Sequence, residues 1–240
     1  MLHGFHAVRV LLERAPLRVL RVWVAATRDD ARVAQILELA RKSDRPVERV
    51  ERARLEAIAG NAVHQGLVAE VRPLPTWTED DLMSALGSVR APLLLVLDGV
   101  QDPHNLGACL RTADACGALA IIVPKDRSAP LNATARKVAA GAAEFTPTVL
   151  VTNLARCLRD LKSAGIWVIG ADAAADRAIA AVDLQGGVAI VLGSEGAGLR
   201  HLTRQVCDLT VRLPMQGSVE SLNVSVAAGM LLYEAVRQRG

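Results

Sequence analysis

The spacing of apolar residues differs between the two ends of the chain. Before residue 75, short runs with strand-like alternation are separated by stretches whose apolar residues fall at helical spacing. The helix expected from Thr27 would have Asp30 three residues later, a variant of the capping box. This alternation predicts one small α/β domain with the elements His6–Arg14 (helix), Val19–Ala25 (strand), Thr27 to about Ala40 (helix), Val47–Val50 (strand), Leu55–Ala59 (helix) and Leu67–Val71 (strand).

Beyond residue 90 the apolar runs are nearly continuous. Such runs are typical of parallel strands that helices cover on both faces. The predicted strands are Leu93–Leu97, Leu119–Val123, Ile166–Ile169, Val188–Leu192 and Leu209–Leu213. Helical spacing in the intervening stretches predicts the covering helices Leu106–Cys116, Leu131–Ala140, Leu154–Ala164 and Val224–Arg237. The second pattern therefore predicts a parallel-sheet α/β domain.

A change in composition separates these two patterns. The segment Pro73–Asp80 contains two prolines, and a short polar helix is expected between it and Pro92. We therefore expect a first domain at residues 1–75, a linker at 76–89 and a second domain at 90–240.

Composition and charge add to this picture. Hydrophobic residues make up 51% of the chain and aromatic residues only 2%, which favours α/β layers over an aromatic-rich sandwich. Residues 1–75 contain 13 Lys/Arg and 9 Asp/Glu, whereas residues 76–240 contain 15 and 16. A basic first domain suits a polyanionic partner such as RNA. Arg-rich, solvated helix faces explain the imbalance equally well, so both interpretations stay open at this point.

Several classes of protein do not fit the sequence. The four cysteines lack the close paired spacing of a zinc site and are expected to be reduced core thiols, and no His/Cys/Asp cluster has the spacing of metal ligands. Charged residues interrupt every apolar run near the start of the chain, so neither a signal-peptide core nor a membrane span is expected. The three tryptophans stand singly and are expected in the core. We expect a soluble, cytoplasmic protein without a metal.

Ligands of open α/β sheets bind at the carboxyl ends of strands, and two unusual segments directly follow predicted strands. In Asp98–Ala113, Asn105 stands near a predicted helix start, with Arg111 six residues later. A helix cap and a surface charge would explain them as well as a functional role does. In Gly193–Leu199, glycines that allow close backbone approach surround Glu195. This second segment lacks the GxGxxG spacing of a dinucleotide site.

A third unusual segment, Leu213–Gly229, precedes and enters the last predicted helix. Polar side chains crowd its helix start, where one cap would be sufficient: Ser218, Ser221, Asn223 and Ser225. The surplus of hydroxyl and amide groups suggests contacts with a ligand.

Together, the three segments resemble motifs one, two and three of the SpoU/TrmH branch of the SPOUT RNA methyltransferases, in the same order. The resemblance covers residues 90–240. It extends to the first domain, because HGFHAV at residues 3–8 and HQGLVAEV at residues 64–71 resemble the substrate-binding domain of the RlmB-type enzymes of that branch. Those enzymes methylate the ribose of a guanosine in large-subunit (23S) ribosomal RNA.

The resemblance implies a fold, a cofactor and a site. The family fold is a parallel sheet with a deep trefoil knot whose loops bind S-adenosyl-L-methionine, and two subunits complete each active site. By this resemblance Gly193, Leu213 and Leu222 contact the cofactor. The implied catalytic residues are Asn105, Arg111, Glu195, Ser221 and Asn223. Arg111 is the implied activator of the ribose hydroxyl, and because its pKa exceeds about 12 we expect an electrostatic role rather than proton abstraction.

The expected function is therefore methyl transfer from S-adenosylmethionine to a ribose 2'-hydroxyl of ribosomal RNA, by a homodimer. The same reaction on transfer RNA is an alternative, against which the extra first domain argues. A non-catalytic ribosome-assembly factor is another, against which the intact motif residues argue. A dinucleotide-dependent oxidoreductase is disfavoured because the GxGxxG fingerprint is missing.

Overall fold

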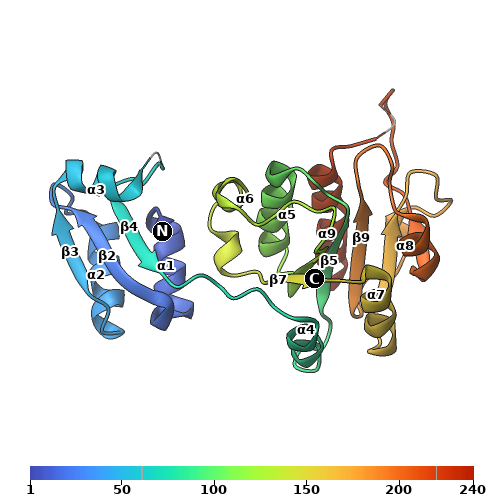
Figure 1. Ribbon diagram of the computed structural model, residues 1–240, viewed down its shortest axis with the longest axis horizontal. Helices are drawn as coiled ribbons and strands as arrows, with labels where there is room; N and C mark the ends of the chain where they lie inside the picture. The colour runs from blue at the N-terminus through green and yellow to red at the C-terminus, as the bar shows by residue number, and fades with distance from the viewer. Residues whose placement is uncertain (61, 220) are drawn as a thin grey trace. The chain divides into compact units, whose positions relative to one another are not determined.

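The computed structural model describes residues 1–60, 62–219 and 221–240 (Figure 1). The chain divides into two compact units, Met1–Leu74 and Pro75–Gly240. Each unit has its own sheet, so each is described by itself.

The N-terminal unit contains a mixed sheet of the order β1-β4-β2-β3. Strand β2 pairs in parallel with β3 and antiparallel with β4, which pairs antiparallel with β1. The strands are β1 (Leu2–His3), β2 (Val19–Ala25), β3 (Val47–Val50) and β4 (Leu67–Val71), and the helices are α1 (Phe5–Arg14), the 3-10 turn η1 (Pro16–Arg18), α2 (Ala31–Lys42) and α3 (Arg52–Ala59). The predicted small α/β domain is confirmed; the two-residue strand β1 was not predicted.

Helix α2 begins four residues later than its predicted start. The side chain of Asp30 accepts hydrogen bonds from the backbone N–H groups of Arg32 and Val33 at 3.0 and 3.2 Å, so Asp30 is the N-cap. The predicted start at Thr27 is therefore wrong. A carboxylate that can reach two free N–H groups at once competes successfully with a hydroxyl further back.

The C-terminal unit contains a six-stranded parallel sheet of the order β10-β8-β9-β5-β6-β7. The strands are β5 (Leu93–Asp98), β6 (Ala120–Pro124), β7 (Thr148–Val151), β8 (Trp167–Ala171), β9 (Val188–Gly193) and β10 (Leu209–Val211). All five predicted runs form strands of this sheet. Edge strand β7 was not predicted, and Leu150 in it is 40% exposed.

Helices cover both faces of this sheet, as the continuous apolar runs require (Figure 1). One apolar cluster joins the sheet to α5, α6 and α9, and the other joins it to α4, α7 and α8. The helices and 3-10 turns are α4 (Glu79–Leu86), α5 (Pro103–Ala115), α6 (Ala133–Val138), η2 (Ala142–Glu144), α7 (Leu154–Ser163), η3 (Ile179–Ala181), α8 (His201–Val206) and α9 (Val224–Arg239). Helix α8 was not predicted.

The segment at residues 76–89 packs onto the second sheet. Trp77 donates its backbone N–H to Thr148 O at 3.0 Å, beside edge strand β7. Thr78 and Asp81 then form a reciprocal capping box that starts α4.

The tryptophans and cysteines that were expected in the core differ in their burial. Trp23 is buried, whereas Trp167 is 52% exposed at the start of β8, so the expectation of a core position is wrong for Trp167. The four cysteines are free, and Cys109 and Cys157 are buried. Burial raises the pKa of each of these two thiols to about 12.

Candidate active site

The site begins where two neighbouring strands end. Strands β5 and β9 run in parallel and in register, with Asp98 opposite Gly193 at their carboxyl ends. The loops that follow these residues therefore leave the sheet side by side. Ligands of open α/β sheets bind at this edge.

The first of these loops leads into α5. The helix begins at Pro103, where the side chain of Asp102 accepts from His104 N at 2.8 Å, and this hydrogen bond lowers the pKa of Asp102. The predicted start near Asn105 is therefore two residues too late. Because Asp102 provides the cap, the side chain of Asn105 is free for another contact. Its Nδ2 donates to Glu195 Oε1 at 3.1 Å.

The second loop is a closed turn that presents Glu195. Ser194 and Gly198 exchange backbone hydrogen bonds of 3.0 and 3.1 Å. Gly193 packs against the far side of this turn, where an added Cβ would lie 2.0 Å from the carbonyl of Gly198. Such a distance is below any real contact, so this position accepts only glycine. Gly196 and Gly198 adopt positive φ values of 81° and 66°, which other residues rarely adopt.

The third motif reaches the same place through the N-cap of α9. Asn223 Oδ1 accepts from the backbone N–H of Ser225 at 2.9 Å and from its hydroxyl at 2.6 Å. The Nδ2 group of Asn223 donates to Asn105 Oδ1 at 2.9 Å and to Glu195 Oε1 at 2.8 Å. These three side chains, which we call the Asn105–Glu195–Asn223 triangle, link all three motifs.

The triangle has a defined polarity. Glu195 Oε1 accepts from both amides, and the Ser225 hydrogen bonds fix which end of the Asn223 amide faces it. Glu195 and Asn223 are exposed and Asn105 is half-buried, so a ligand can reach all three. The arrangement holds a carboxylate and two oriented amides at one point, where they can bind and orient a polar group.

Two of the predicted catalytic residues do not join the triangle. Arg111 lies six residues after Asn105 on α5, about 120° around the helix. Its side chain is exposed, and within the described part of the chain it makes no hydrogen bond or ion pair. Ser221 is also exposed in the segment before α9, without a side-chain hydrogen bond to any described residue.

The residues implied at the cofactor lie at the same edge of the sheet. Gly193 ends β9, Leu213 follows β10 by two residues, and Leu222 directly precedes Asn223. Leu213 and Leu222 are half-buried, and their backbone groups make no hydrogen bonds to the backbone of other described residues. Half-buried apolar walls beside free backbone groups fit an adenine, whose polar edge such groups can bind.

An ion pair between the buried Asp98 and the partly exposed Arg200 was not predicted. Asp98 is 1% exposed at the end of β5. Its carboxylate accepts from the backbone N–H of Arg200 at 3.1 Å and forms an ion pair with the Arg200 guanidinium. This pair ties the end of the Glu195 turn to the neighbouring strand. A carboxylate that ends an otherwise apolar strand was the available signal in the sequence.

A pocket of about 350 Å³ opens beside the triangle. It lies at the ends of β5, β6 and β9 and has Asn105 and Glu195 in its wall. The remaining lining residues are Asp98, Gly99, Val100, Gln101, Asp102, Arg127, Ser194, Arg200 and Val224.

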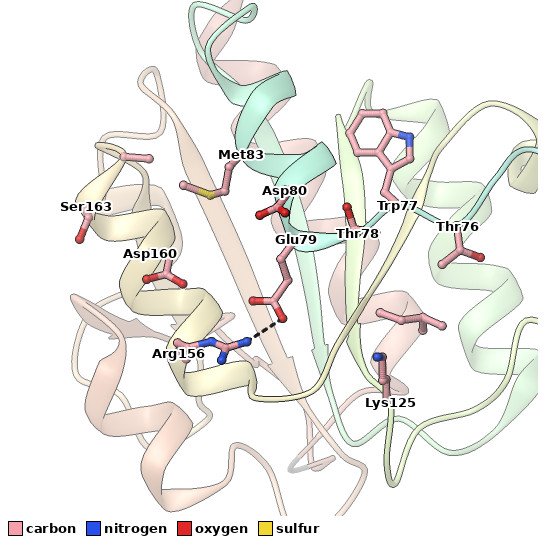
Figure 2. Close-up of a pocket in the computed structure, with 12 residues that line it drawn as sticks. Thr76, Trp77, Thr78, Glu79, Asp80, Met83, Lys125, Arg156, Asp160 and Ser163 are labelled. Atoms are coloured by element: carbon pink, nitrogen blue, oxygen red, sulfur yellow. Dashed lines mark hydrogen bonds and ion pairs between the residues drawn. The ribbon is translucent and has the colours of Figure 1, made fainter.

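A larger hollow of about 910 Å³ lies between α4, α7 and the ends of β6 and β7. Figure 2 shows Arg156 on α7 reaching Glu79 on α4 within this hollow, with an Nη2 to Oε1 distance of 3.1 Å. Lys125 and Trp77 also line it. No predicted site residue does, so the smaller pocket is the better candidate for the chemistry.

Metal-binding clusters and membrane-spanning helices are both absent from the described residues. Among the described residues, no group of three or more His, Cys, Asp or Glu side chains is placed to hold a metal ion. Within the same residues, no helix has the length and apolar character needed to cross a membrane.

Comparison with known proteins identifies the family. The model of the SpoU rRNA methylase family matches residues 92–233, and the model of an RNA 2'-O ribose methyltransferase substrate-binding domain matches residues 1–77. The chain belongs to the SpoU rRNA methylase family. The resemblance seen in the three motifs is thereby confirmed.

Relatives in the SpoU rRNA methylase family match this chain over nearly its whole length. The 23S rRNA (guanosine-2'-O-)-methyltransferase RlmB of Pseudomonas aeruginosa is 55% identical, and the match covers 99% of this chain and 96% of the relative. RlmB of Escherichia coli is 50% identical, with coverage of 100% and 98%. These two relatives are similar in both domains, not only in the three motifs.

Solved structures agree with this assignment. The SpoU methyltransferase AviRb from Streptomyces viridochromogenes, in complex with the cofactor AdoMet, superimposes with a TM-score of 0.76 at 26% identity, covering 99% of this chain and 89% of AviRb. The A. aeolicus TrmH/SpoU tRNA modifying enzyme has a TM-score of 0.57 at 28% identity and covers only 67% of this chain.

Proposed function

We propose that this protein transfers a methyl group from S-adenosylmethionine to the ribose 2'-hydroxyl of a guanosine in 23S ribosomal RNA. The observation that carries the proposal is the Asn105–Glu195–Asn223 triangle, because it brings together one side chain from each family motif. Full-length similarity to the two RlmB enzymes supports the same substrate. A ribosomal RNA substrate also supports the cytoplasmic location expected from the sequence.

The chemistry divides between the cofactor and the chain. S-adenosylmethionine supplies the electrophilic methyl group, and Gly193, Leu213 and Leu222 would hold it. The chain then has to align the ribose hydroxyl, which is a weak nucleophile, and stabilise the charge that develops on its oxygen. Asn105, Glu195 and Asn223 have the donors and the acceptor to orient that hydroxyl. Ser221, two residues before Asn223, would add a further hydroxyl contact.

Arg111 would supply the positive charge. It is exposed and has no partner among the described residues, so its guanidinium is available to a phosphate or to the developing alkoxide. It lies on a different side of α5 from Asn105. This separation supports a site that is completed by a second copy of the chain. The exposed side chains of Met230 (47%) and Tyr233 (64%) on α9 offer apolar area for such a homodimer.

Mixing two inactive variants tests the homodimer. Arg111→Ala and Glu195→Ala chains would each be inactive alone. If the site combines Glu195 from one subunit with Arg111 from the other, the mixture should recover up to about a quarter of wild-type activity, because half of the dimers regain one complete site. No recovery after subunit exchange, or full activity of a species of monomer mass in light scattering, would contradict the shared site.

The proposed fold includes the trefoil knot of the family. The segment between β8 and β9 lies against the end of β10, where Asp172 N donates to Val211 O at 2.8 Å and Ile179 N donates to Arg212 O at 3.1 Å. The Arg212 guanidinium also donates to Ala175 O at 2.8 Å. The chain beyond Arg212 then continues to α9, which packs on α5 and also on η3 of the segment between β8 and β9. These contacts support a threaded C-terminal segment.

The N-terminal unit would recruit the RNA. The substrate-binding family match and the excess of Lys and Arg before residue 75 support this role. A hollow of about 690 Å³ in this unit has Arg28, Arg52 and His64 in its wall, together with Glu56, which pairs with Arg52. The methyl-transfer chemistry would remain in the C-terminal unit.

One experiment tests the main proposal. The purified protein is incubated with methyl-labelled S-adenosylmethionine and either 23S ribosomal RNA or a transfer RNA pool. We expect label in 23S RNA, on the 2'-oxygen of a guanosine. Label only in transfer RNA would favour the alternative substrate, and cofactor binding without methyl transfer to either RNA would favour a non-catalytic assembly factor.

A further inference from the structure

The loop after β6 contains an arginine in an unusual backbone conformation. Arg127 has a φ of 58°, in the left-handed region that residues other than glycine seldom occupy. The chain holds this conformation although a glycine at the same position would adopt it freely. Strain of this kind gathers at functional sites, where a side chain has to be held in one direction.

The loop around Arg127 is fixed at both of its ends. Lys125 N donates to Val151 O at 2.9 Å, and Ala129 N donates to Val100 O at 2.8 Å. The second bond joins the loop to the segment between Asp98 and α5, which carries the first motif. Between these anchors, the buried Ser128 Oγ has no hydrogen-bond partner among the described residues. The loop is therefore fixed by backbone hydrogen bonds on both sides of Arg127.

Arg127 lines the 350 Å³ pocket together with Asn105 and Glu195. It is exposed, and its side chain makes no hydrogen bond or ion pair within residues 1–60, 62–219 and 221–240. The three carboxylates of the pocket are all engaged by other groups: Asp98 by Arg200, Asp102 by His104, and Glu195 by Asn105 and Asn223. Arg127 is thus the cation in this wall that is left for a ligand.

The position of the pocket indicates which ligand Arg127 would bind. None of the three residues expected at the cofactor, Gly193, Leu213 and Leu222, lines it. The pocket has Asn105 and Glu195 of the triangle in its wall, so a group bound there lies beside the side chains that are proposed to orient the ribose hydroxyl. An RNA strand carries a phosphate on each side of every ribose, and an arginine fork binds phosphate oxygens in pairs.

We propose that Arg127 binds a backbone phosphate of the RNA substrate next to the target nucleotide, and so positions the ribose at the Asn105–Glu195–Asn223 triangle. This inference rests on the proposed RNA methyltransferase function. Arg127 is a positioning residue: its guanidinium contacts the phosphate, while the reacting hydroxyl contacts the triangle.

Two variants remove the guanidinium in different ways. Arg127→Gly also relieves the left-handed backbone, whereas Arg127→Ala keeps it, so a shared effect of the two reports on the side chain alone. Arg159→Ala is the matched control, because Arg159 is an exposed arginine on α7 whose side chain also makes no hydrogen bond or ion pair to a described residue. Each variant is studied as the full chain.

The measurements are the affinity for a 23S RNA fragment at several salt concentrations, the affinity for S-adenosylmethionine, and the methylation kinetics. For both Arg127 variants we expect RNA affinity to fall by about 10-fold, with the slope of log K against log salt smaller by about 1. KM for RNA should rise more than kcat falls, and cofactor affinity should stay unchanged. Arg127→Lys should restore the salt slope but only part of the rate, because a lysine lacks the fork.

Three outcomes would overturn the proposal. An unchanged salt slope in both Arg127 variants would remove the phosphate contact. A loss of S-adenosylmethionine affinity with normal RNA binding would mean that Arg127 binds the cofactor carboxylate instead. An equal loss of RNA affinity in Arg159→Ala would show that the effect comes from net charge and not from the position of Arg127. RNA binding is measured separately from turnover, so a wild-type protein that binds this RNA but does not methylate it would contradict the proposed function and leave the Arg127 test intact.

Discussion

The side-chain amide of Asn223 donates a 2.8 Å hydrogen bond to the carboxylate of Glu195, across 28 residues of sequence. This contact joins the start of the last helix to the turn after β9. Asn105 forms hydrogen bonds with both of these residues. Replacing any one of the three side chains therefore removes two of the three hydrogen bonds. The first prediction follows from this dependence.

Glu195→Ala should lower the single-turnover methylation rate by about 100-fold or more, because two amides lose the acceptor that orients them. Glu195 is exposed, so unfolding temperature should change little. Glu195→Gln keeps the shape and one acceptor oxygen and should retain more of the rate than Glu195→Ala. Equal rates for wild type and Glu195→Ala would remove the triangle from the reaction.

Arg111→Ala should leave S-adenosylmethionine affinity nearly unchanged while lowering the methylation rate by about 100-fold or more, the scale expected for a lost electrostatic stabiliser. Arg111→Lys should recover little, because it keeps the charge and loses the planar fork. Calorimetry and single-turnover rates measure the two quantities. Arg159→Ala is again the control, and a near-wild-type rate for Arg111→Ala would rule out this role.

Arg200→Met should lower the free energy of unfolding by about 3 kcal/mol or more, because the buried Asp98 carboxylate loses its counter-charge. Asp98→Asn should cost less, since the side chain of Arg200 is 43% exposed and can turn to water. The double variant should be more stable than Arg200→Met alone. Urea unfolding of the four proteins measures the coupling, and strictly additive changes would show that the pair does not contribute as a unit.

A chain that starts at Pro75 should bind S-adenosylmethionine as tightly as the full protein but bind ribosomal RNA more weakly and with a smaller salt dependence. The reason is that the basic first unit is absent while the cofactor residues remain. Filter binding at several salt concentrations, beside calorimetry with the cofactor, tests this. If the shortened chain bound and methylated the RNA as well as the full protein, the first unit would have no recruiting role.

Stability should decrease in alkaline solution because of the buried thiols. Burial raises the pKa of Cys109 and of Cys157 to about 12, while a thiol in the unfolded chain titrates near about 8.5. Their contribution is fully present below the unfolded value and is lost as pH rises toward the folded value. Each thiol then lowers the free energy of unfolding by about 1.4 kcal/mol per pH unit. Between pH 9 and 10, Cys109→Ala should show a shallower decrease than wild type in urea unfolding, and identical slopes would contradict the assignment.

Sequence periodicity predicted the elements that bury continuous apolar surface. In the second domain, all five long apolar runs became parallel strands, and the four covering helices were predicted within a few residues of their ends. Elements with little apolar surface were missed: β1 has two residues, and α8 has only Thr203 and Val206 buried. Helix starts were wrong where a nearby aspartate provided the cap, as Asp30 and Asp102 do.

The site was predictable only in part. Gly193, Glu195 and Asn223 stood out because glycines or surplus polar groups followed apolar strands. Arg127 and the Asp98–Arg200 pair were not singled out, because a charge in a loop looks like ordinary solvated surface until its neighbours are known. Neither spacing nor composition shows that Asp98 is 1% exposed, or that the backbone of Arg127 is left-handed.

The place of β9 in the sheet has a consequence for biosynthesis. This strand lies between β5 and β8, yet it is made after both of them. Until residue 193 has left the ribosome, β8 cannot be joined to β5, β6 and β7, and the backbone N–H and C=O groups along one edge of β5 have no partner strand. An exposed edge of this kind pairs readily with other chains. Nascent chains that stop before β9 should therefore aggregate. Synthesis of β9 removes this open edge, so the sheet is protected from pairing with other chains only when roughly the last 50 residues are being made.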